Sequence, residues 1–321
     1  MDMLETLKAL SDPSRLRLVA VLLHGEFTVQ ELTHILAMGQ SRISRHLKIL
    51  TEAGVLSVKR QGTWSYYRAG GEGPFFETIR PALEQRFGEL PKHDSDLAAL
   101  TEVLEERRRR SQRFFDQHAR QWDDLARTLL PVPDYRERLL ASVPQGVTVV
   151  EVGLGTGGLL PALAARAGRV IGVDHSPAML EEAGRRLAAA GLADIDLRLG
   201  EMAHLPLPDK SADCAVLNMV LHHAADPGAV LHEIRRVLAP GGVLVLADLA
   251  RHEREWVRER LADQWLGFGE DEVAAWLMAA GFVEISCERL VGENGQETVL
   301  VVKSTIPCAS PSLFRRGPGG G

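Results

Sequence analysis

The sequence predicts two domains of different class: an α-rich helix-turn-helix domain ending in a β-hairpin, and then an α/β domain of the Rossmann-like kind with a mostly parallel sheet. Three observations lead to this. A length of 321 residues suits about two domains. The first ninety residues carry helical periodicity and one polar turn between two strand-like runs. From residue 147 onward, strand-like runs alternate with helical patterns through short links, as in a doubly wound sheet.

Composition narrows the class of protein. The chain is 45% hydrophobic and 25% charged, as in ordinary globular proteins. Its longest apolar runs fall far short of a membrane helix, and its acidic start lacks the basic and apolar regions of a signal peptide, so we expect a cytoplasmic protein without a membrane partner. Cys214, Cys287 and Cys308 are too few and too far apart for a disulfide framework or a metal clip.

Charge is distributed unevenly along the chain. The formal net charge is -6, yet residues 1–70 hold nine Lys and Arg against six Asp and Glu. A modest basic excess suits phosphate contact by the first domain of a dimer, whereas the acidic remainder would repel DNA.

The first helices are recognisable from their ends. A mostly apolar helix is expected from Pro13 to the stop at Gly25, with Ser11 or Asp12 as its N-cap. A second, short helix is expected from Thr28 to Ala37, because Thr-x-x-Glu at residues 28–31 is a capping box.

A third helix, from Ser41 to Ala53, has the pattern of a recognition helix. Its apolar stripe is Ile43, Leu47 and Leu50, and its opposite face is polar and basic toward the N-terminal end, where such a helix meets base edges. The side chains expected to contact DNA from this helix are Gln40, Ser41, Arg42, Ser44, Arg45 and Lys48.

A basic-tipped hairpin follows. Strand-like residues 55–58 and 64–68 flank the polar turn 59–63, which makes a wing with Lys59 and Arg60 as further DNA contacts. With Leu-Ser-Asp-Pro-Ser-Arg-Leu at residues 10–16 and the Gln-Ser-x-x-Ser-x-His-Leu segment at 40–47, this stretch resembles the ArsR-type winged-helix regulators over about residues 4–90.

The resemblance implies a homodimer on a palindromic double-stranded DNA operator, with the first helix and the helix near residues 75–87 in the dimer interface. Metal-sensing relatives carry cysteines in the helix before the turn, but residues 29–32 offer none, so we expect no metal site. His46 either reads a base or packs within the motif.

A connector follows at residues 91–145. It is expected to form one long helix from Leu97 to Leu130, ended by Pro131. The four arginines at 107–110 suggest nucleic-acid contact or, as we favour, a solvated helical face with Glu–Arg pairing. The segment 115–123 either packs as core or covers the cofactor pocket, as in relatives.

A glycine-rich turn opens the second domain. Glu-Val-Gly-Leu-Gly-Thr-Gly at residues 151–157 ends an apolar strand and begins a helix, so its backbone can approach a nucleotide-like ligand. Gly153, Gly155 and Gly158 also satisfy the dinucleotide pattern, with Asp174 as the acidic partner, and that pattern alone is weak.

Further motifs favour S-adenosylmethionine over a dinucleotide. These are Asp-His-Ser-x-x-Met-Leu at 174–180, Gly-Glu-Met at 200–202, Asn-x-x-Leu-His-His at 218–223 and Pro-Gly-Gly at 240–242. Together they resemble the class I methyltransferases, near the quinone-biosynthesis C-methyltransferases, over roughly residues 110–303. The resemblance implies a seven-stranded, mostly parallel sheet.

It also implies roles for individual residues. Asp174 would bind the ribose hydroxyls, His175 and Met179 would flank the adenine, Glu201 and the Met202 backbone would meet the adenine edge, and Asn218 would lie at the methionine moiety. Aspartate is usual in place of Glu201, which puts that contact in doubt. The expected cofactor-binding set is Glu151, Gly153, Gly155, Gly157, Asp174, His175, Met179, Glu201, Met202 and Asn218.

Catalysis is not decided by these motifs, because methyl transfer is an in-line displacement that needs chiefly positioning. His222 and His223 are candidate bases, or simply part of the cofactor loop. The chain lacks the Asn-Pro-Pro-Tyr motif of base N-methylation and a cysteine cluster like that of arsenite methyltransferases.

The sequence therefore predicts a DNA-binding regulator, most simply a repressor, that senses S-adenosylmethionine or S-adenosylhomocysteine. Segments at 251–256, 263–268 and 276–282 look like those of ArsR–methyltransferase fusions, some of which are linked with methionine and methyl-cycle genes. The alternative is an active small-molecule methyltransferase with an attached winged helix. The expected divisions are 1–90, the connector 91–145, the cofactor domain 146–303 and a disordered tail 304–321.

Overall fold

The computed structural model describes residues 3–70, 73–293 and 297–308. The chain divides into two compact units. The N-terminal unit takes in residues 1–118, 221–228 and 249–268, and the sheet unit takes in 119–220, 229–248 and 269–321. Two later segments of the chain, 221–228 and 249–268, therefore belong to the same compact unit as the winged helix. The sequence-based divisions at 90, 145 and 303 stay a proposal.

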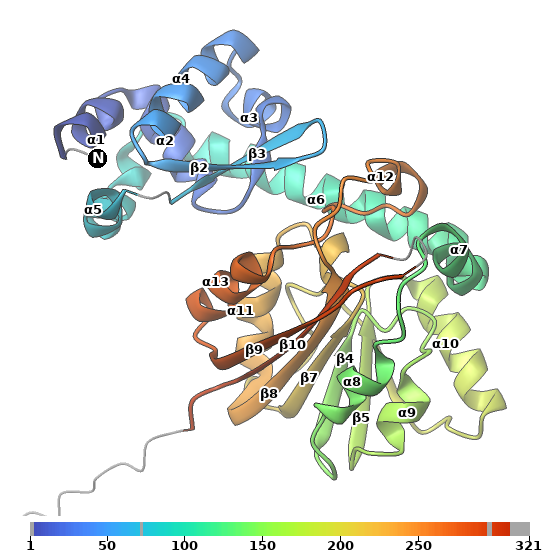
Figure 1. The fold of residues 1–321 in the computed structure, drawn as a ribbon. Coiled ribbons are helices and arrows are strands. Elements are labelled where there is room, and N and C mark those ends of the chain that lie inside the picture. Colours follow the sequence, from blue (N-terminus) through green and yellow to red (C-terminus); the bar gives the residue numbers. More distant parts are fainter. Residues whose placement is uncertain (1–2, 71–72, 294–296, 309–321) are drawn as a thin grey trace, which may run out of the picture. The chain divides into compact units, whose positions relative to one another are not determined.

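Helices and one small sheet make up the N-terminal unit (Figure 1). Its helices are α1 (Met3–Leu10), α2 (Pro13–Leu22), α3 (Val29–Leu36), α4 (Gln40–Glu52), α5 (Pro74–Glu84), η1 (Phe87–Glu89), α6 (His93–His118), η3 (Leu221–His223) and α12 (Val257–Arg260). Its strands are β1 (Phe27–Thr28), β2 (Leu56–Gln61) and β3 (Trp64–Ala69), in the order β1-β3-β2.

Local capping sets where α2 and α3 begin. Asp12, one of the two expected caps, accepts hydrogen bonds from the backbone N–H of Ser14 (2.8 Å) and Arg15 (3.1 Å). Thr28 and Glu31 form the expected capping box of α3. Both caps satisfy N–H groups that the first helical turn leaves without partners.

The helix-turn-helix is held together by one apolar core. The stripe Ile43, Leu47 and Leu50 of α4 is fully buried, together with Leu18 and Leu22 of α2. Burying each such side chain stabilises a fold by about 1.5–3 kcal/mol. The stripe expected from the sequence is therefore the side of α4 that faces the core.

The connector helix is shorter than expected. In place of one helix to residue 130, α6 ends at His118, and η2 (Ala119–Gln121) and α7 (Trp122–Leu129) follow. At the end of α6, the Nδ1 atom of His118 lies 2.8 Å from the Phe114 carbonyl oxygen. Such side-chain contacts compete with the backbone hydrogen bonds that would continue a helix. The boundary between the two units lies at the same residue.

The sheet unit has the expected architecture, with helices on both sides of a seven-stranded sheet (Figure 1). Its strands are β4 (Thr148–Val152), β5 (Arg169–Asp174), β6 (Asp196–Leu199), β7 (Ala212–Asn218), β8 (Leu238–Leu249), β9 (Val283–Leu290) and β10 (Val299–Thr305). Its helices are α7, α8 (Arg136–Ala141), α9 (Leu160–Ala164), α10 (Pro177–Ala189), α11 (Pro227–Val237) and α13 (Glu270–Ala279).

Strand order explains the position of the glycine turn. The order is β6-β5-β4-β7-β8-β10-β9, with parallel pairing from β6 through β8 and antiparallel pairing between β10 and β9. The chain winds outward in both directions from β4, and ligands bind at the carboxyl ends of strands at such a switch point.

The seventh strand that the resemblance implies is β9, whose residues the sequence pattern does not mark. It is an edge strand and most of its residues are exposed, so it lacks a buried apolar pattern. Strand β10 continues to Thr305, two residues into the expected tail. Gly-Glu-Asn-Gly at residues 292–295 has the pattern of a hairpin turn, but residues 294–296 lie outside the described residues, as do residues 309–321 of the expected tail. Among the described helices, none has the length and apolar content needed to cross a membrane.

Candidate cofactor and DNA-binding sites

The glycine turn after β4 adopts a backbone that glycine alone enters easily. Gly153, Gly155 and Gly157 have φ values of 71°, 55° and 75°. A Cβ atom on Gly153 would lie 2.2 Å from Val220 Cγ2, whereas a Cβ on Gly155 would meet no atom within 4 Å. The turn therefore packs closely on one side and leaves open space at Gly155, where a ligand can approach the backbone.

Asp174 lies at the end of β5 and is hydrogen-bonded to this turn. Its Oδ2 accepts a hydrogen bond from the Gly155 N–H (2.8 Å), and its Oδ1 accepts one from the Ser176 N–H (2.9 Å). The residue is 6% exposed. Two backbone donors thus fix the carboxylate beside the open space, as a ribose-binding group requires.

Glu151 is a second buried carboxyl in this region. It is 1% exposed, and its Oε2 has no hydrogen-bond partner among the described residues. Burial, and then the charge of Asp174, raise the pKa of Glu151 to about 8. A cationic ligand would favour the ionised carboxyl. S-adenosylmethionine carries a sulfonium and an ammonium group, so this donor set fits that cofactor.

The remaining expected cofactor residues belong to the same unit. Met179 is buried in the first turn of α10, where its N–H donates to Ser176 Oγ (3.2 Å). His175 follows β5, Glu201 and Met202 follow β6, and Asn218 ends β7. The whole expected set therefore lies in β4, β5, β7 or α10, or in the turns that follow β4, β5 and β6.

Three contacts at this site were not expected from the sequence. The Tyr135 hydroxyl donates to Asn218 Oδ1 (2.8 Å), and burial raises the Tyr135 pKa to about 12. Asp123 accepts a hydrogen bond from the Thr156 hydroxyl (2.8 Å) and pairs with Arg186. Asp123, the last residue of the segment 115–123 that was expected either to pack as core or to cover the cofactor pocket, thus contacts the glycine turn. Tyr135 belongs to no motif that would have indicated it.

The expected DNA-contacting side chains of α4 share its exposed face. Gln40, Ser41, Arg42, Ser44, Arg45 and Lys48 are all exposed. His46, by contrast, is only 8% exposed, and burial lowers its pKa. This burial favours packing over base readout for His46.

Replacing Arg45 by Ala should weaken binding to DNA from upstream of the protein's own gene by about 10- to 100-fold, since an arginine at a base or phosphate contributes roughly 1–3 kcal/mol. Affinity for the cofactor should not change. Arg127→Ala is the matched control, because that arginine is also exposed (76%) but lies on α7. Equal DNA binding by the two variants would show that α4 does not read DNA.

The wing residues differ from each other in their surroundings. Arg60 is exposed, whereas the Lys59 ammonium lies 4.8 Å from the centre of the Trp265 ring and 5.4 Å from that of Phe268. These distances suit cation–π contact. Lys59 is therefore engaged within the N-terminal unit.

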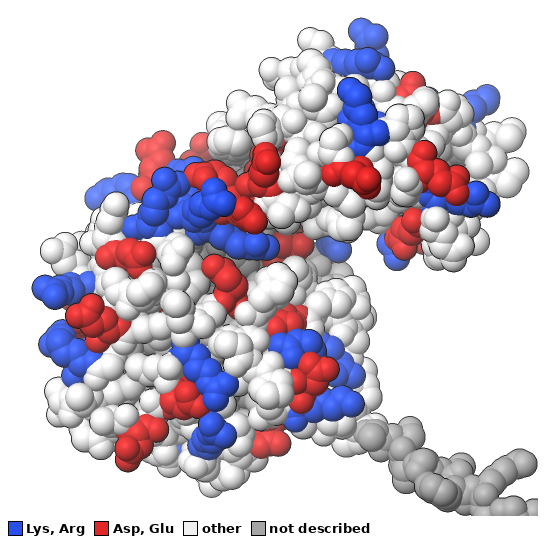
Figure 2. Space-filling view, turned by 180° about the vertical axis from the view of Figure 1, so that it is seen from behind, with Lys and Arg blue, Asp and Glu red and all other residues white. Residues whose placement is uncertain are grey.

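The four-arginine run is partly a solvated face and partly structural. Arg109 pairs with Glu105 (2.6 Å) one turn away, and basic and acidic side chains are interspersed on the face shown in Figure 2. Arg107 is different, because its side chain is 9% exposed and pairs with Glu31 of α3 (2.7 Å). The sequence pattern does not distinguish these two arginines.

Glu151→Gln should stabilise the ligand-free protein at alkaline pH. The folded state holds the Glu151 proton up to pH about 8, against an ordinary pKa of 4.5. Wild-type stability therefore falls as pH rises between these values, by up to about 1.4 kcal/mol per pH unit, whereas glutamine does not titrate.

Thermal midpoints of wild type and Glu151→Gln, measured near pH 5 and pH 8.5, check this. The Glu151→Gln variant should have a higher thermal midpoint than wild type at pH 8.5. Replacing the exposed Glu137 by Gln should leave the midpoint unchanged at both pH values. A variant-to-wild-type difference independent of pH would contradict the raised pKa.

The candidate bases His222 and His223 lie in η3 and belong to the N-terminal unit. Both are buried, and the His223 ring packs edge-on against Phe115, with ring centres 4.9 Å apart. Asp263 is the carboxylate residue that groups with them, 3.9 Å from His222 and 3.7 Å from His223.

Two family models match the chain. The model for bacterial regulatory proteins of the arsR family matches residues 12–58, and a methyltransferase domain model matches residues 150–246. An arsenic resistance transcriptional regulator of Pseudomonas putida is 47% identical over 68 residues, which are 21% of this chain and 53% of the relative.

Methyltransferases are also among the similar proteins. An arsenite methyltransferase of Halobacterium salinarum is 34% identical over 118 residues, 36% of this chain and 30% of the relative. A demethylmenaquinone methyltransferase of Symbiobacterium thermophilum is 35% identical over 127 residues, 38% of this chain and 51% of the relative. The chain thus spans from 30% to 53% of the length of these curated relatives.

One solved structure supports the fold. A chain of the complex between a methyltransferase activator and a methyltransferase from Haloferax volcanii superposes with a TM-score of 0.50 and 24% identity, covering 60% of this chain and 97% of that one. A methyltransferase domain implies a cofactor of the S-adenosylmethionine type, and an arsR-type helix-turn-helix implies DNA binding. The chain therefore joins a winged-helix domain of the bacterial arsR regulatory family to a class I methyltransferase domain.

Proposed function

We propose that this protein is a DNA-binding transcriptional regulator, a repressor in its simplest form, whose affinity for DNA is set by S-adenosylmethionine or S-adenosylhomocysteine. One observation carries the proposal. The chain leaves the carboxyl ends of β7 and β8, where the cofactor is expected, and residues 221–228 and 249–268 then pack with the wing in one compact unit. Ligand-dependent movement at the ends of these strands has a short covalent path to the DNA-binding surface.

The wing is hydrogen-bonded to the second of these segments. Gln61 is 2% exposed; its Nε2 donates to the Gly267 carbonyl (3.1 Å), and its Oε1 accepts from the Leu266 N–H (3.1 Å). At the turn of the hairpin, the Thr63 hydroxyl donates to Glu255 Oε2 (3.1 Å). Both ends of the wing turn are therefore fixed to residues 249–268.

Trp265 joins both segments to the wing. Its Nε1 donates to the Ala224 carbonyl (2.8 Å), and its ring packs on Tyr66 of β3 with centres 4.9 Å apart. The Lys59 ammonium lies over the same ring. A lysine held there is not available for a phosphate, so movement of Trp265 would change what the wing offers to DNA.

Coupling requires that the ligand bind the two states of this unit unequally, because a ligand with equal affinity for both shifts nothing. S-adenosylmethionine and S-adenosylhomocysteine differ by the charged sulfonium, and the site holds the buried carboxyls Glu151 and Asp174. Charge at this site is thus a physical basis for discriminating the two.

The proposal includes a homodimer on a palindromic operator and a cytoplasmic location, where the DNA lies. Helix α1 supports the dimer, because it exposes Met3 (49%), Leu4 (52%) and Leu7 (44%) and contacts α5. An exposed apolar stripe on a short helix is typical of an interface. We place no metal in the helix-turn-helix itself.

The test is a titration of the full-length protein on DNA from its own promoter, at fixed salt, with each adenosyl ligand separately. A shift in affinity of tenfold or more with one ligand, about 1.4 kcal/mol of coupling, is expected. Tight binding of both ligands with no shift would overturn sensing. Genes of methionine and methyl-cycle metabolism are the targets to examine first.

The second candidate is an active small-molecule methyltransferase, and the methyltransferase domain model that matches residues 150–246 favours it, together with the similarity to known methyltransferases. Incubation with methyl-labelled S-adenosylmethionine and a metabolite extract tests this. A labelled product that forms with wild type and not with Asp174→Ala would establish turnover. His222 and His223 would then need examination as bases.

A further inference from the structure

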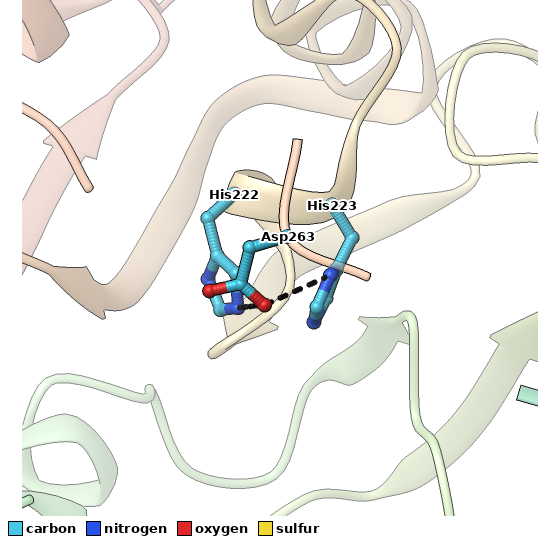
Figure 3. A group of neighbouring side chains, drawn as sticks. All are labelled: His222, His223 and Asp263. Atoms are coloured by element: carbon cyan, nitrogen blue, oxygen red, sulfur yellow. Dashed lines mark ion pairs between the residues drawn. The ribbon is translucent and has the colours of Figure 1, made fainter. Parts of the chain in front are cut away.

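Two neighbouring histidines and an aspartate converge in the N-terminal unit (Figure 3). His222 Nε2 lies 3.9 Å from Asp263 Oδ1, and His223 Nδ1 lies 3.7 Å from the same oxygen. All three side chains are buried, at 6%, 4% and 1% exposure. One ligand atom from each lies within 4.8 Å of the other two.

We propose that His222, His223 and Asp263 bind one divalent transition-metal ion of the zinc type. Imidazole nitrogens and a carboxylate bind such an ion at about 2.0–2.2 Å, which places neighbouring ligand atoms at roughly 3.4 Å in a tetrahedral shell. The observed separations to Asp263 exceed this by a few tenths of an ångström. Binding an ion would require the three side chains to rotate toward one another.

The surroundings suit a metal ligand set. Phe115 packs edge-on against the His223 ring and shields the cluster from water. His223 Nδ1 also lies 3.4 Å from the Ala262 carbonyl, a long contact that this nitrogen gives up when it binds an ion.

A position for a further ligand exists beside the cluster. Three protein ligands leave one place in a tetrahedral shell, as at zinc sites that exchange ligands. Asp263 also lines a cavity of about 850 Å³, together with Tyr66, Ser111 and Arg258. Ser111 is 6% exposed, and its Oγ has no hydrogen-bond partner in the described structure. Water or a small polar ligand in the cavity can complete the shell.

The donor set selects the kind of ion. Mg²⁺ and Ca²⁺ prefer shells made of oxygen, whereas two imidazoles with one carboxylate suit Zn²⁺, Co²⁺, Ni²⁺ or Fe²⁺. None of the three residues belongs to the helix-turn-helix or to the expected cofactor set. Its ion would join residues 221–228 to residues 249–268, the two segments that Trp265 connects to the wing. If the proposed function holds, metal binding would thus be a second signal, beside the adenosyl ligand, that acts on the wing.

The test uses full-length, tag-free protein treated with a chelator, and calorimetric titration with Zn²⁺ and, separately, Mg²⁺. One Zn²⁺ per chain is expected, with Kd at or below about 1 μM, and no comparable binding of Mg²⁺. Asp263→Asn, which preserves side-chain shape, and His223→Gln should each weaken Zn²⁺ binding by at least about 100-fold. His232→Ala, an exposed histidine on α11, is the control.

Co²⁺ gives an independent readout in wild type alone, should a ligand variant fail to fold. Visible absorption bands that Zn²⁺ abolishes, without a thiolate charge-transfer band, would support binding by nitrogen and oxygen and exclude Cys287 and Cys308, which are exposed. Failure of wild type to bind one equivalent of Zn²⁺ at tens of micromolar overturns the proposal. So does equal Zn²⁺ affinity in wild type and both folded ligand variants.

Discussion

An Asp174→Ala variant is expected to lose at least about 100-fold in affinity for S-adenosylmethionine, which corresponds to about 2.7 kcal/mol. The carboxylate accepts hydrogen bonds from the Gly155 and Ser176 N–H groups, and a hydrogen bond to a charged group contributes roughly 1.5–3 kcal/mol. Its removal eliminates the expected ribose contact and also releases the glycine turn. Equilibrium dialysis with labelled cofactor measures the loss.

The control is Asp196→Ala on the neighbouring strand β6. Asp196 is likewise a carboxylate held by its neighbours, here Arg198 (2.8 Å) and Arg169 (2.9 Å), but it lies outside the expected cofactor set. The Asp196→Ala variant should bind the cofactor with the same affinity as wild type. Binding by Asp174→Ala within fivefold of wild type would remove Asp174 from the site. In the promoter titration, Asp174→Ala should keep the DNA affinity of the ligand-free protein at any ligand concentration.

The parts of the structure that could be predicted from the sequence are those determined locally. A cap needs only its own turn, so Asp12 and Thr28 were found at their helices. The glycine turn after β4 is similarly local, because three positive φ values require glycine there. Alternating strands and helices then restrict the topology to a parallel sheet.

Other features depend on partners distant in sequence. Arg107 and Arg109 are identical residues in one run, but only Arg107 meets Glu31 from α3. Nothing in the sequence around Tyr135 indicates its hydrogen bond to Asn218. The packing of 221–228 and 249–268 with the wing is likewise a tertiary property, because in sequence these segments are loops of the second domain.

Trp265→Ala is expected to destabilise the N-terminal unit by about 3–5 kcal/mol, the usual cost of a large cavity in a core. Trp265 is 2% exposed and is among the largest fully buried side chains described. The variant also leaves the Ala224 carbonyl without its hydrogen-bond donor and removes the ring beneath Lys59. Amide hydrogen exchange in residues 56–69 should rise sharply, since the wing loses its contact with residues 249–268.

Two further variants test whether the loss of stability comes from the buried ring of Trp265. Trp265→Phe retains most of the ring and loses the indole N–H, so it should cost about 1–3 kcal/mol. Trp64→Ala removes an exposed wing tryptophan (39%) and should change stability little. If Trp265→Ala left wing exchange as slow as in wild type, the wing would be held by its own hairpin. The contact with residues 249–268 would then not determine the stability of the wing.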